Sequence, residues 1–311
     1  MKMNNKKLNL PTVDMDTASA TGNIEILNQW LRSDHKLKYT NRAIYNASRN
    51  GHTNILKWWL KSGLKLKYNS NAIDIASRNG HINVLNWWLA AKKDSDISLR
   101  YSDYSIDNAS ITKQIDVLDW WLNSGLKLKY SKASINDASA RGHVDVLNWW
   151  LESSLELKYS DDAICIASCN GRIDVLNWWL KSDLELEYTC YAIDSASFNG
   201  HVDVLDWWKN SGIELLYTAD AIDIASEYRK INVLHWWKNS GLELLYTDNA
   251  LENATGNGHI SVLNWWKYSG LELKYPEDVA IYAQNLNVML WWNDFKQYRI
   301  KLNNKRHKSN K

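Results

Sequence analysis

Apolar residues recur along the chain at helical spacing, in short segments that glycine separates. In residues 39–68 the first such segment ends at Gly51 and the second ends at Gly63. Glycine adopts the left-handed conformation that closes many helices at little cost. The stretch that follows, from Leu64 to Tyr68, alternates apolar and charged residues with a period of two. We therefore expect each unit to contain two short helices and one extended connector.

The two helices differ in how much of their surface is apolar. On the first helix, Ile44 and Ala47 share one face, whereas Arg42 and Tyr45 lie on the opposite face. On the second helix, which is expected from about Thr53 to Ser62, apolar residues cover about 220° of the circumference. A helix of this kind needs neighbours on three sides. The pattern therefore predicts a solenoid in which each unit packs between the units before and after it.

The motif Val-Leu-Asn-Trp-Trp, at Val84–Trp88, shows how often the unit is repeated. It recurs nine more times in variant form, and the ten copies together contain all 19 tryptophans. Successive second tryptophans are 29 residues apart, except for one interval of 33 and a last one of 26. The chain is therefore an array of about ten units. The second tryptophans are Trp30, Trp59, Trp88, Trp121, Trp150, Trp179, Trp208, Trp237, Trp266 and Trp292.

The segment Ala76–Leu89 resembles the ankyrin repeat. It has a small pair, Ala76-Ser77, then a Gly80-His81 loop, and Trp87-Trp88-Leu89 stands where the family has three leucines. The resemblance covers nearly the whole chain, from about Leu8 to Trp292. It is closest to the tryptophan-rich ankyrin-like arrays of giant DNA viruses. The resemblance implies an all-α solenoid of helix-turn-helix repeats that binds other proteins inside a cell, with the host cytoplasm as the expected compartment.

The chain departs from the ankyrin pattern in length. The ankyrin unit has about 33 residues, so a unit of 29 residues is expected to have a shortened hairpin finger. Four extra residues near Lys92 restore the longer interval and predict one longer finger. A leucine-rich repeat can also have 29 residues, with Leu-x-Leu-x-Tyr as its strand. That alternative leaves no place for two capped helices in each unit.

Charge is distributed unevenly although the net charge is only +2. Residues 1–150 carry a net charge of +8 and residues 151–295 a net charge of −13. We expect residues 1–7 to be a basic lead, residues 8–295 the array, and residues 296–311 a basic, disordered tail. The basic parts suggest nucleic-acid binding as the alternative function. The change of sign would permit head-to-tail association of a chain that we expect to be a monomer.

No catalytic motif is found in the sequence, and we expect neither an enzyme nor a cofactor. The tryptophans are expected to form the core, and their N–H groups to find acceptors. Loop histidines such as His52 are expected to brace the loops, because one per unit cannot reach a shared metal ion. Three cysteines favour a reducing compartment. Neither a secretory signal at Met1–Val13 nor a membrane helix is expected.

Aspartates recur at one position of the first helix, and we expect each to pair with a cap hydroxyl such as that of Thr40, or with a loop histidine. The outward positions of Arg42 and Arg49, in contrast, vary from copy to copy. Fixed framework positions beside one variable face are typical of a recognition surface, and neutral drift on a solvated face is the alternative. Aromatic residues dominate binding hot spots. The candidate partner-binding residues are Arg42, Tyr45, Tyr104, Tyr191, Phe198 and Tyr228.

Overall fold

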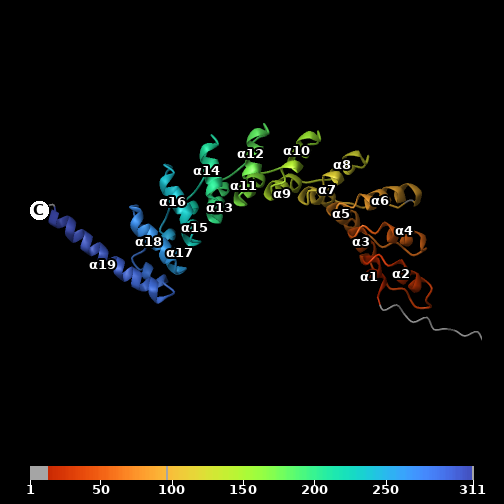
Figure 1. Cartoon of the computed structure of the whole chain (residues 1–311), viewed down its shortest axis with the longest axis horizontal. Helices are drawn as coiled ribbons and strands as arrows, with labels where there is room; N and C mark the ends of the chain where they lie inside the picture. The colour runs from red at the N-terminus through yellow and green to blue at the C-terminus, as the bar shows by residue number, and fades with distance from the viewer. Residues whose placement is uncertain (1–12, 96, 310–311) are drawn as a thin grey trace, which may run out of the picture. The chain divides into compact units, whose positions relative to one another are not determined.

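The structure is a computed structural model that describes residues 13–95 and 97–309. These residues form nineteen α-helices and one short 3-10 helix, and none of them lies in a strand. The helices come in pairs that stack as a solenoid, so the all-α prediction is confirmed (Figure 1). A leucine-rich horseshoe needs a strand in every repeat and is therefore wrong for the described chain.

The chain forms two compact units, which are described separately. The first contains the described residues up to Ala138 together with His143–Tyr159, and the second contains Ser139–Gly142 and the described residues from Ser160 onward. The helices of the first unit are α1 (Met15–Ala20), α2 (Ile24–Leu31), α3 (Arg42–Arg49), α4 (Thr53–Lys61), α5 (Asn71–Arg78), α6 (Ile82–Ser95), α7 (Tyr104–Ile111), α8 (Ile115–Asn123) and α10 (Val144–Glu152). The boundary between the units falls inside α9 (Ala133–Arg141).

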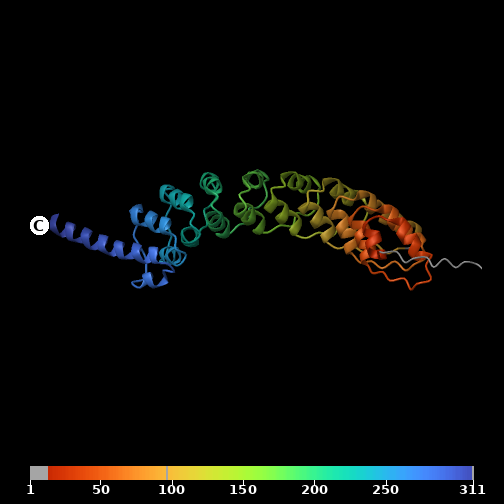
Figure 2. The same ribbon diagram turned by 60° about the horizontal axis from the view of Figure 1, so that its bottom comes forward.

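The second unit repeats the same arrangement. Its elements are α11 (Asp162–Cys169), α12 (Ile173–Lys181), α13 (Tyr191–Asn199), α14 (Val202–Asn210), α15 (Asp220–Glu227), α16 (Ile231–Asn239), α17 (Asn249–Gly256), α18 (Ile260–Ser269), η1 (Val279–Tyr282) and α19 (Leu286–Ser309). Within each unit, first helices pack against first helices and second helices against second helices (Figure 2). In the last repeat the 3-10 helix η1 takes the place of a first helix.

From Trp59 onward, the second tryptophan of each repeat lies in the core, whereas Trp30 in the first repeat is half-buried. Trp59 is completely buried, whereas Trp58 is half-buried at the rim and meets it edge to face at 5.2 Å between ring centroids. The indole N–H of Trp59 donates to the hydroxyl of Ser19 in the preceding repeat, at 2.9 Å. The prediction of buried, hydrogen-bonded indoles is confirmed here. The same bond joins Trp121 to Ser77, Trp150 to Ser110, Trp208 to Ser168, Trp237 to Ser197 and Trp266 to Ser226.

The recurring aspartate pairs with a cap hydroxyl of the next repeat, as predicted. Asp16 accepts hydrogen bonds from the hydroxyl and the backbone N–H of Thr40, at 2.6 and 2.9 Å. The hydroxyl of Thr40 in turn accepts from the backbone N–H of Arg42, at 3.1 Å, and so caps α3. The same arrangement joins Asp74 to Ser102, Asp107 to Ser131, Asp194 to Thr218 and Asp223 to Thr247.

Among side-chain hydrogen bonds between repeats, the indole, amide and loop-histidine donors point back to the preceding repeat, whereas the hydroxyl of a connector tyrosine such as Tyr39 donates forward, to the carbonyl of Lys65 at 2.9 Å. His52 donates through Nε2 to the carbonyl of Ala20 at 3.2 Å, and Trp58 donates to Asn28 at 2.8 Å. The loop-bracing role of the histidine is therefore confirmed at this turn. In the first repeat, Trp30 instead donates to the carbonyl of Val13, at 2.8 Å. The indole, amide and histidine bonds consequently share one direction, with their acceptors facing the following repeat.

Two segments differ from the prediction. The four residues added near Lys92 do not form a longer finger, because they lengthen α6 to 14 residues. Alanine and lysine favour helix where most other copies have Ser-Gly, and they carry the helix onward. The segment 296–311, expected to be disordered, is helical up to Ser309 as the end of α19. It contains neither glycine nor proline to stop that helix.

Candidate functional site

Five of the candidate partner-binding residues lie on first helices, and Tyr228 lies in the turn directly after α15. Tyr104 is 64% exposed, Tyr191 is 53% exposed and Tyr228 is 51% exposed. Arg42 is also exposed, and Tyr45 is half-buried. The face therefore has large aromatic side chains available for contact.

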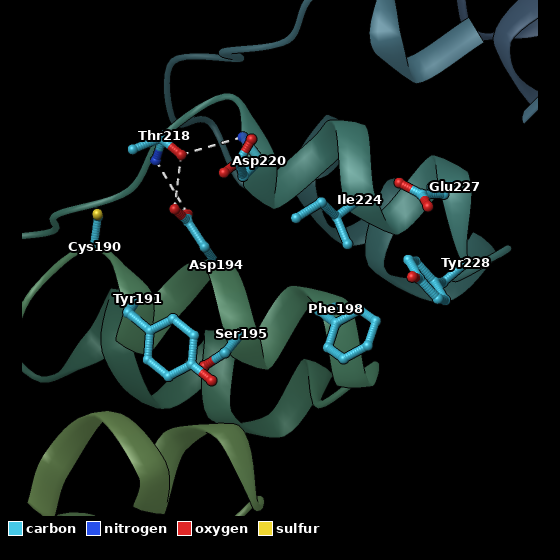
Figure 3. A pocket seen from close by; sticks show the side chains of 10 residues that line it. All are labelled: Cys190, Tyr191, Asp194, Ser195, Phe198, Thr218, Asp220, Ile224, Glu227 and Tyr228. Atoms are coloured by element: carbon cyan, nitrogen blue, oxygen red, sulfur yellow. Dashed lines mark hydrogen bonds between the residues drawn. The ribbon is translucent and has the colours of Figure 1, made fainter. Parts of the chain in front are cut away.

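Three of the candidates gather around one pocket in the second unit. Tyr191, Phe198 and Tyr228 line a cavity of about 500 Å³ between α13 and α15 (Figure 3). Cavities of roughly 300–1,000 Å³ are typical of ligand sites. In the first unit, Tyr45 and Tyr104 line a smaller cavity of about 150 Å³ beside α5. Arg42 is not among the residues that line either cavity.

Each wall of the larger cavity comes from successive turns of one helix. Tyr191 and Phe198 are seven residues apart on α13 and therefore point the same way. On the facing helix α15, Asp220 and Glu227 occupy the equivalent two positions, with Ile224 between them (Figure 3). One wall is thus aromatic, and the other carries a carboxylate toward each end.

Tyr228 closes one end of the cavity by meeting Phe198. Their ring centroids are 4.7 Å apart and the rings are nearly perpendicular, at 88°. This edge-to-face geometry is the one that aromatic pairs prefer. Tyr228 follows α15 directly, and Arg229 takes the left-handed conformation, with φ of 57°, that glycine adopts in most other copies. The turn keeps its usual backbone conformation but has Tyr228-Arg229 in place of Asn-Gly, so an aromatic ring stands where most repeats have asparagine.

The floor of the cavity belongs to the framework. Asp194 is buried and accepts hydrogen bonds from the hydroxyl and the backbone N–H of Thr218, at 2.7 and 3.1 Å. Burial raises the pKa of Asp194 above its ordinary value, and the negative charge of Asp220 adds to that effect. Asp194 thus holds two neighbouring repeats together, while Asp220 stays exposed at the opening.

Tyr191 is also linked to a cysteine of the preceding repeat. Negative charge on Cys169 raises the pKa of the Tyr191 hydroxyl, and burial and a hydrogen bond between the two side chains act in the same direction. The sulfur of Cys169 also accepts a hydrogen bond from the side-chain amide of Asn199, at 3.2 Å. Cys165 lies 3.6 Å from the hydroxyl of Thr189 and takes the place of the recurring aspartate. These contacts give both cysteines a place in the packing.

Sequence reasoning identified the aromatic wall but missed the acidic wall. Asp220 and Glu227 stand at the same two variable positions as Tyr191 and Phe198, one repeat later. The signal was therefore present, but at those positions Arg42 and aromatic residues were singled out and the two acids were not. Stacking of adjacent repeats brings residues 29 apart in the sequence to opposite sides of one groove.

Among the described residues, no cluster of three or more histidine, cysteine or acidic side chains could hold a metal ion. Within the same part of the chain, no helix is both long enough and apolar enough to cross a bilayer. The sequence matches no model of a known protein family and no curated protein.

Proposed function

We propose that this protein is a non-enzymatic scaffold that binds another protein through the outward face of its first helices. The contact is centred on the cavity between α13 and α15. We propose further that the array is ankyrin-like, of the tryptophan-rich kind that giant DNA viruses carry, and that it acts inside a cell. Paired short helices, the Gly-His turn and the small Ala-Ser pair support this assignment.

One observation carries the proposal. Tyr191 and Phe198 stand at variable positions and Tyr228 in a variant turn, yet all three line one cavity. The framework of the same helices stays constant, with buried alanine and serine against the neighbouring repeats. Drift on a solvated face would scatter aromatic residues singly. Clustered aromatic side chains around a hollow are instead the usual centre of a protein interface.

Site-specific photocrosslinking in the native cell tests the proposal. A photoreactive phenylalanine analogue at position 198 should give discrete crosslinked proteins, identified by mass spectrometry. The same analogue at Leu180 is the matched control, because Leu180 is 40% exposed on the second helix α12 and Phe198 is 36% exposed. A Tyr191→Ala background should reduce the crosslinks at position 198. Identical bands from both positions, or none from position 198, would overturn the proposal.

Nucleic-acid binding is a second candidate, for the part of the same outward face that lies in the first unit. Arg42, Arg49 and Arg78 lie exposed on the neighbouring helices α3 and α5 of the first unit. Such a row of arginines can contact successive phosphates. The candidate predicts retention on immobilised DNA that falls steeply with salt, and a shallower salt dependence when the three arginines are changed to glutamine. Retention that is unaffected by these changes would exclude this surface.

A further inference from the structure

The groove between α13 and α15 has two chemically different walls. Ring faces and edges of Tyr191 and Phe198 form the α13 side, and Tyr228 adds a third ring at the end (Figure 3). Aromatic ring faces carry partial negative charge and attract cations, most effectively planar guanidinium groups. This wall therefore suits an apolar stem that ends in a positive charge.

The α15 wall supplies full negative charge. Asp220 is exposed at the start of α15, and Glu227 is half-buried in its last turn. One carboxylate oxygen of Glu227, Oε2, accepts a hydrogen bond from the side chain of Asn253 on α17, at 3.1 Å, so Glu227 contacts the following repeat as well as lining the groove. Ile224 separates the two acids and gives the groove an apolar strip along its length. A cation in the groove would thus meet a ring on one side and a carboxylate on the other.

The corresponding positions of the first unit have the opposite character. Asn71, Ile75 and Arg78 of α5 stand in the register of Asp220, Ile224 and Glu227. They line the smaller cavity of the first unit together with Tyr45 and Tyr104. Ile75 matches Ile224, whereas Arg78 occupies the position of Glu227. The acidic wall is therefore a property of one groove and does not follow from the repeat framework.

We propose that the groove between α13 and α15 binds an arginine side chain presented by an extended segment of the partner protein. The inference rests on the proposed scaffold function and names the chemistry of its ligand. The guanidinium plane stacks on the Tyr191 or Phe198 ring and donates to the carboxylate of Asp220 or Glu227. The methylene stem of the arginine packs on Ile224. Lysine carries the charge but lacks the plane, so it fits less well.

Selection from a library of random linear peptides on the full-length chain tests this assignment. Enriched peptides should share an arginine. The dissociation constant is then measured by fluorescence anisotropy for the enriched peptide and for a copy in which citrulline replaces that arginine. Citrulline keeps the plane and removes the charge, and it should weaken binding about tenfold. Lysine in the same place should also weaken binding.

Variants of the full-length chain assign the effect to the groove. Of Asp220→Asn and Glu227→Gln, the substitution that removes the bonded carboxylate should weaken the arginine peptide about tenfold and leave the citrulline peptide unchanged, and the other should have a smaller effect. Phe198→Leu keeps apolar bulk but removes the ring, and should weaken binding about threefold. Glu243→Gln is the matched control, because Glu243 is an exposed acid on a connector. It should change binding by less than roughly twofold, since salt screens distant exposed charges.

Failure of the inference is distinguishable from failure of the scaffold function. The arginine assignment alone would be overturned if the enriched peptides require Phe198 but contain no cation. Such peptides would bind Asp220→Asn and Glu227→Gln as tightly as they bind the native chain. Enriched peptides that bind Phe198→Ala as well as the native chain, or no enrichment at all, would overturn both.

Discussion

Asp223 and Thr247 join two neighbouring repeats of the second unit through a buried carboxylate. Asp223 is 3% exposed and accepts from the backbone N–H of Thr247 at 2.9 Å and from its hydroxyl at 2.5 Å. Burial raises the pKa of Asp223 although these bonds oppose the shift. Asp107 and Asp194 show the same direction for the same first cause. The folded chain therefore holds protons on these carboxyls more tightly than the unfolded chain does.

This difference predicts how stability depends on pH. The contribution of the three aspartates is fully present below the unfolded pKa of about 3.8, and it is lost as pH rises through the raised folded pKa. Asp107→Asn/Asp194→Asn/Asp223→Asn should remove this component, and Asn136 already occupies the position in one native repeat. Urea unfolding of both chains between about pH 4 and 7 measures it. Native stability that rises relative to the variant over this range would contradict the pKa direction.

Two serines at equivalent positions should differ in their effect on stability. Ser77 accepts the indole N–H of Trp121 at 3.0 Å, so Ser77→Ala leaves a buried donor without an acceptor. This should cost about 1–3 kcal/mol. Ser48 and Trp88 are both buried without a hydrogen-bond partner, so Ser48→Ala should cost less than about 0.5 kcal/mol. Urea unfolding of the two variants provides the comparison, and equal losses would show that Ser48 and Trp88 are bonded after all.

Two glycines with the same backbone conformation should also differ. Gly51 and Gly63 have φ of 74° and 73°. A Cβ atom at Gly51 would lie 3.0 Å from Nδ1 of His81, whereas nothing lies within 4 Å at Gly63. Gly63→Ala should therefore cost only the left-handed strain, about 1–2 kcal/mol, and Gly51→Ala should cost more. Thermal unfolding of each variant measures the difference, and a Gly51→Ala variant as stable as Gly63→Ala would refute it.

The two tryptophans of one repeat should tolerate phenylalanine unequally. Trp208 is 1% exposed and donates to Ser168, whereas Trp207 is half-buried and donates to Asn177. Trp208→Phe leaves a void in a closely packed layer and should cost about 2 kcal/mol. Trp207→Phe should cost less than about 1 kcal/mol, because water can reach Asn177. Urea unfolding of the two variants measures the loss of unfolding free energy in each. A larger loss for Trp207→Phe than for Trp208→Phe would reverse the assignment of core and rim.

The fold was predictable because the sequence contains many copies of its own unit. Comparison of copies separated constant positions such as Ala47 from variable ones such as Arg42, and helical spacing placed them on opposite faces. The lengthened α6 was not predictable in the same way. Alanine and lysine favour a helix there, but the single 33-residue interval has no second copy for comparison, and the added length was assigned to the connector.

The candidate site was predictable in part. Tyr191 and Phe198 share a helical face, which local periodicity shows directly. Their position opposite Asp220 and Glu227 depends on how α13 packs against α15, and the spacing within one helix carries no information about that contact. The meeting of Phe198 with Tyr228 further depends on the left-handed turn at Arg229.

Because the indole and amide donors point backward, removing repeats from the N-terminal end and removing them from the C-terminal end should destabilise the array unequally. Removing repeats from the C-terminal side strands carbonyls, serine and tyrosine hydroxyls and, at several junctions, an aspartate carboxylate, all of which water can solvate once they are exposed. Removing the first repeat strands the indole N–H of Trp59 and the amide of Asn50 without Ser19 and Ala20. Trp30 avoids this penalty by turning to Val13. Shortening the array from the N-terminal side should therefore cost more stability per repeat than shortening it from the C-terminal side.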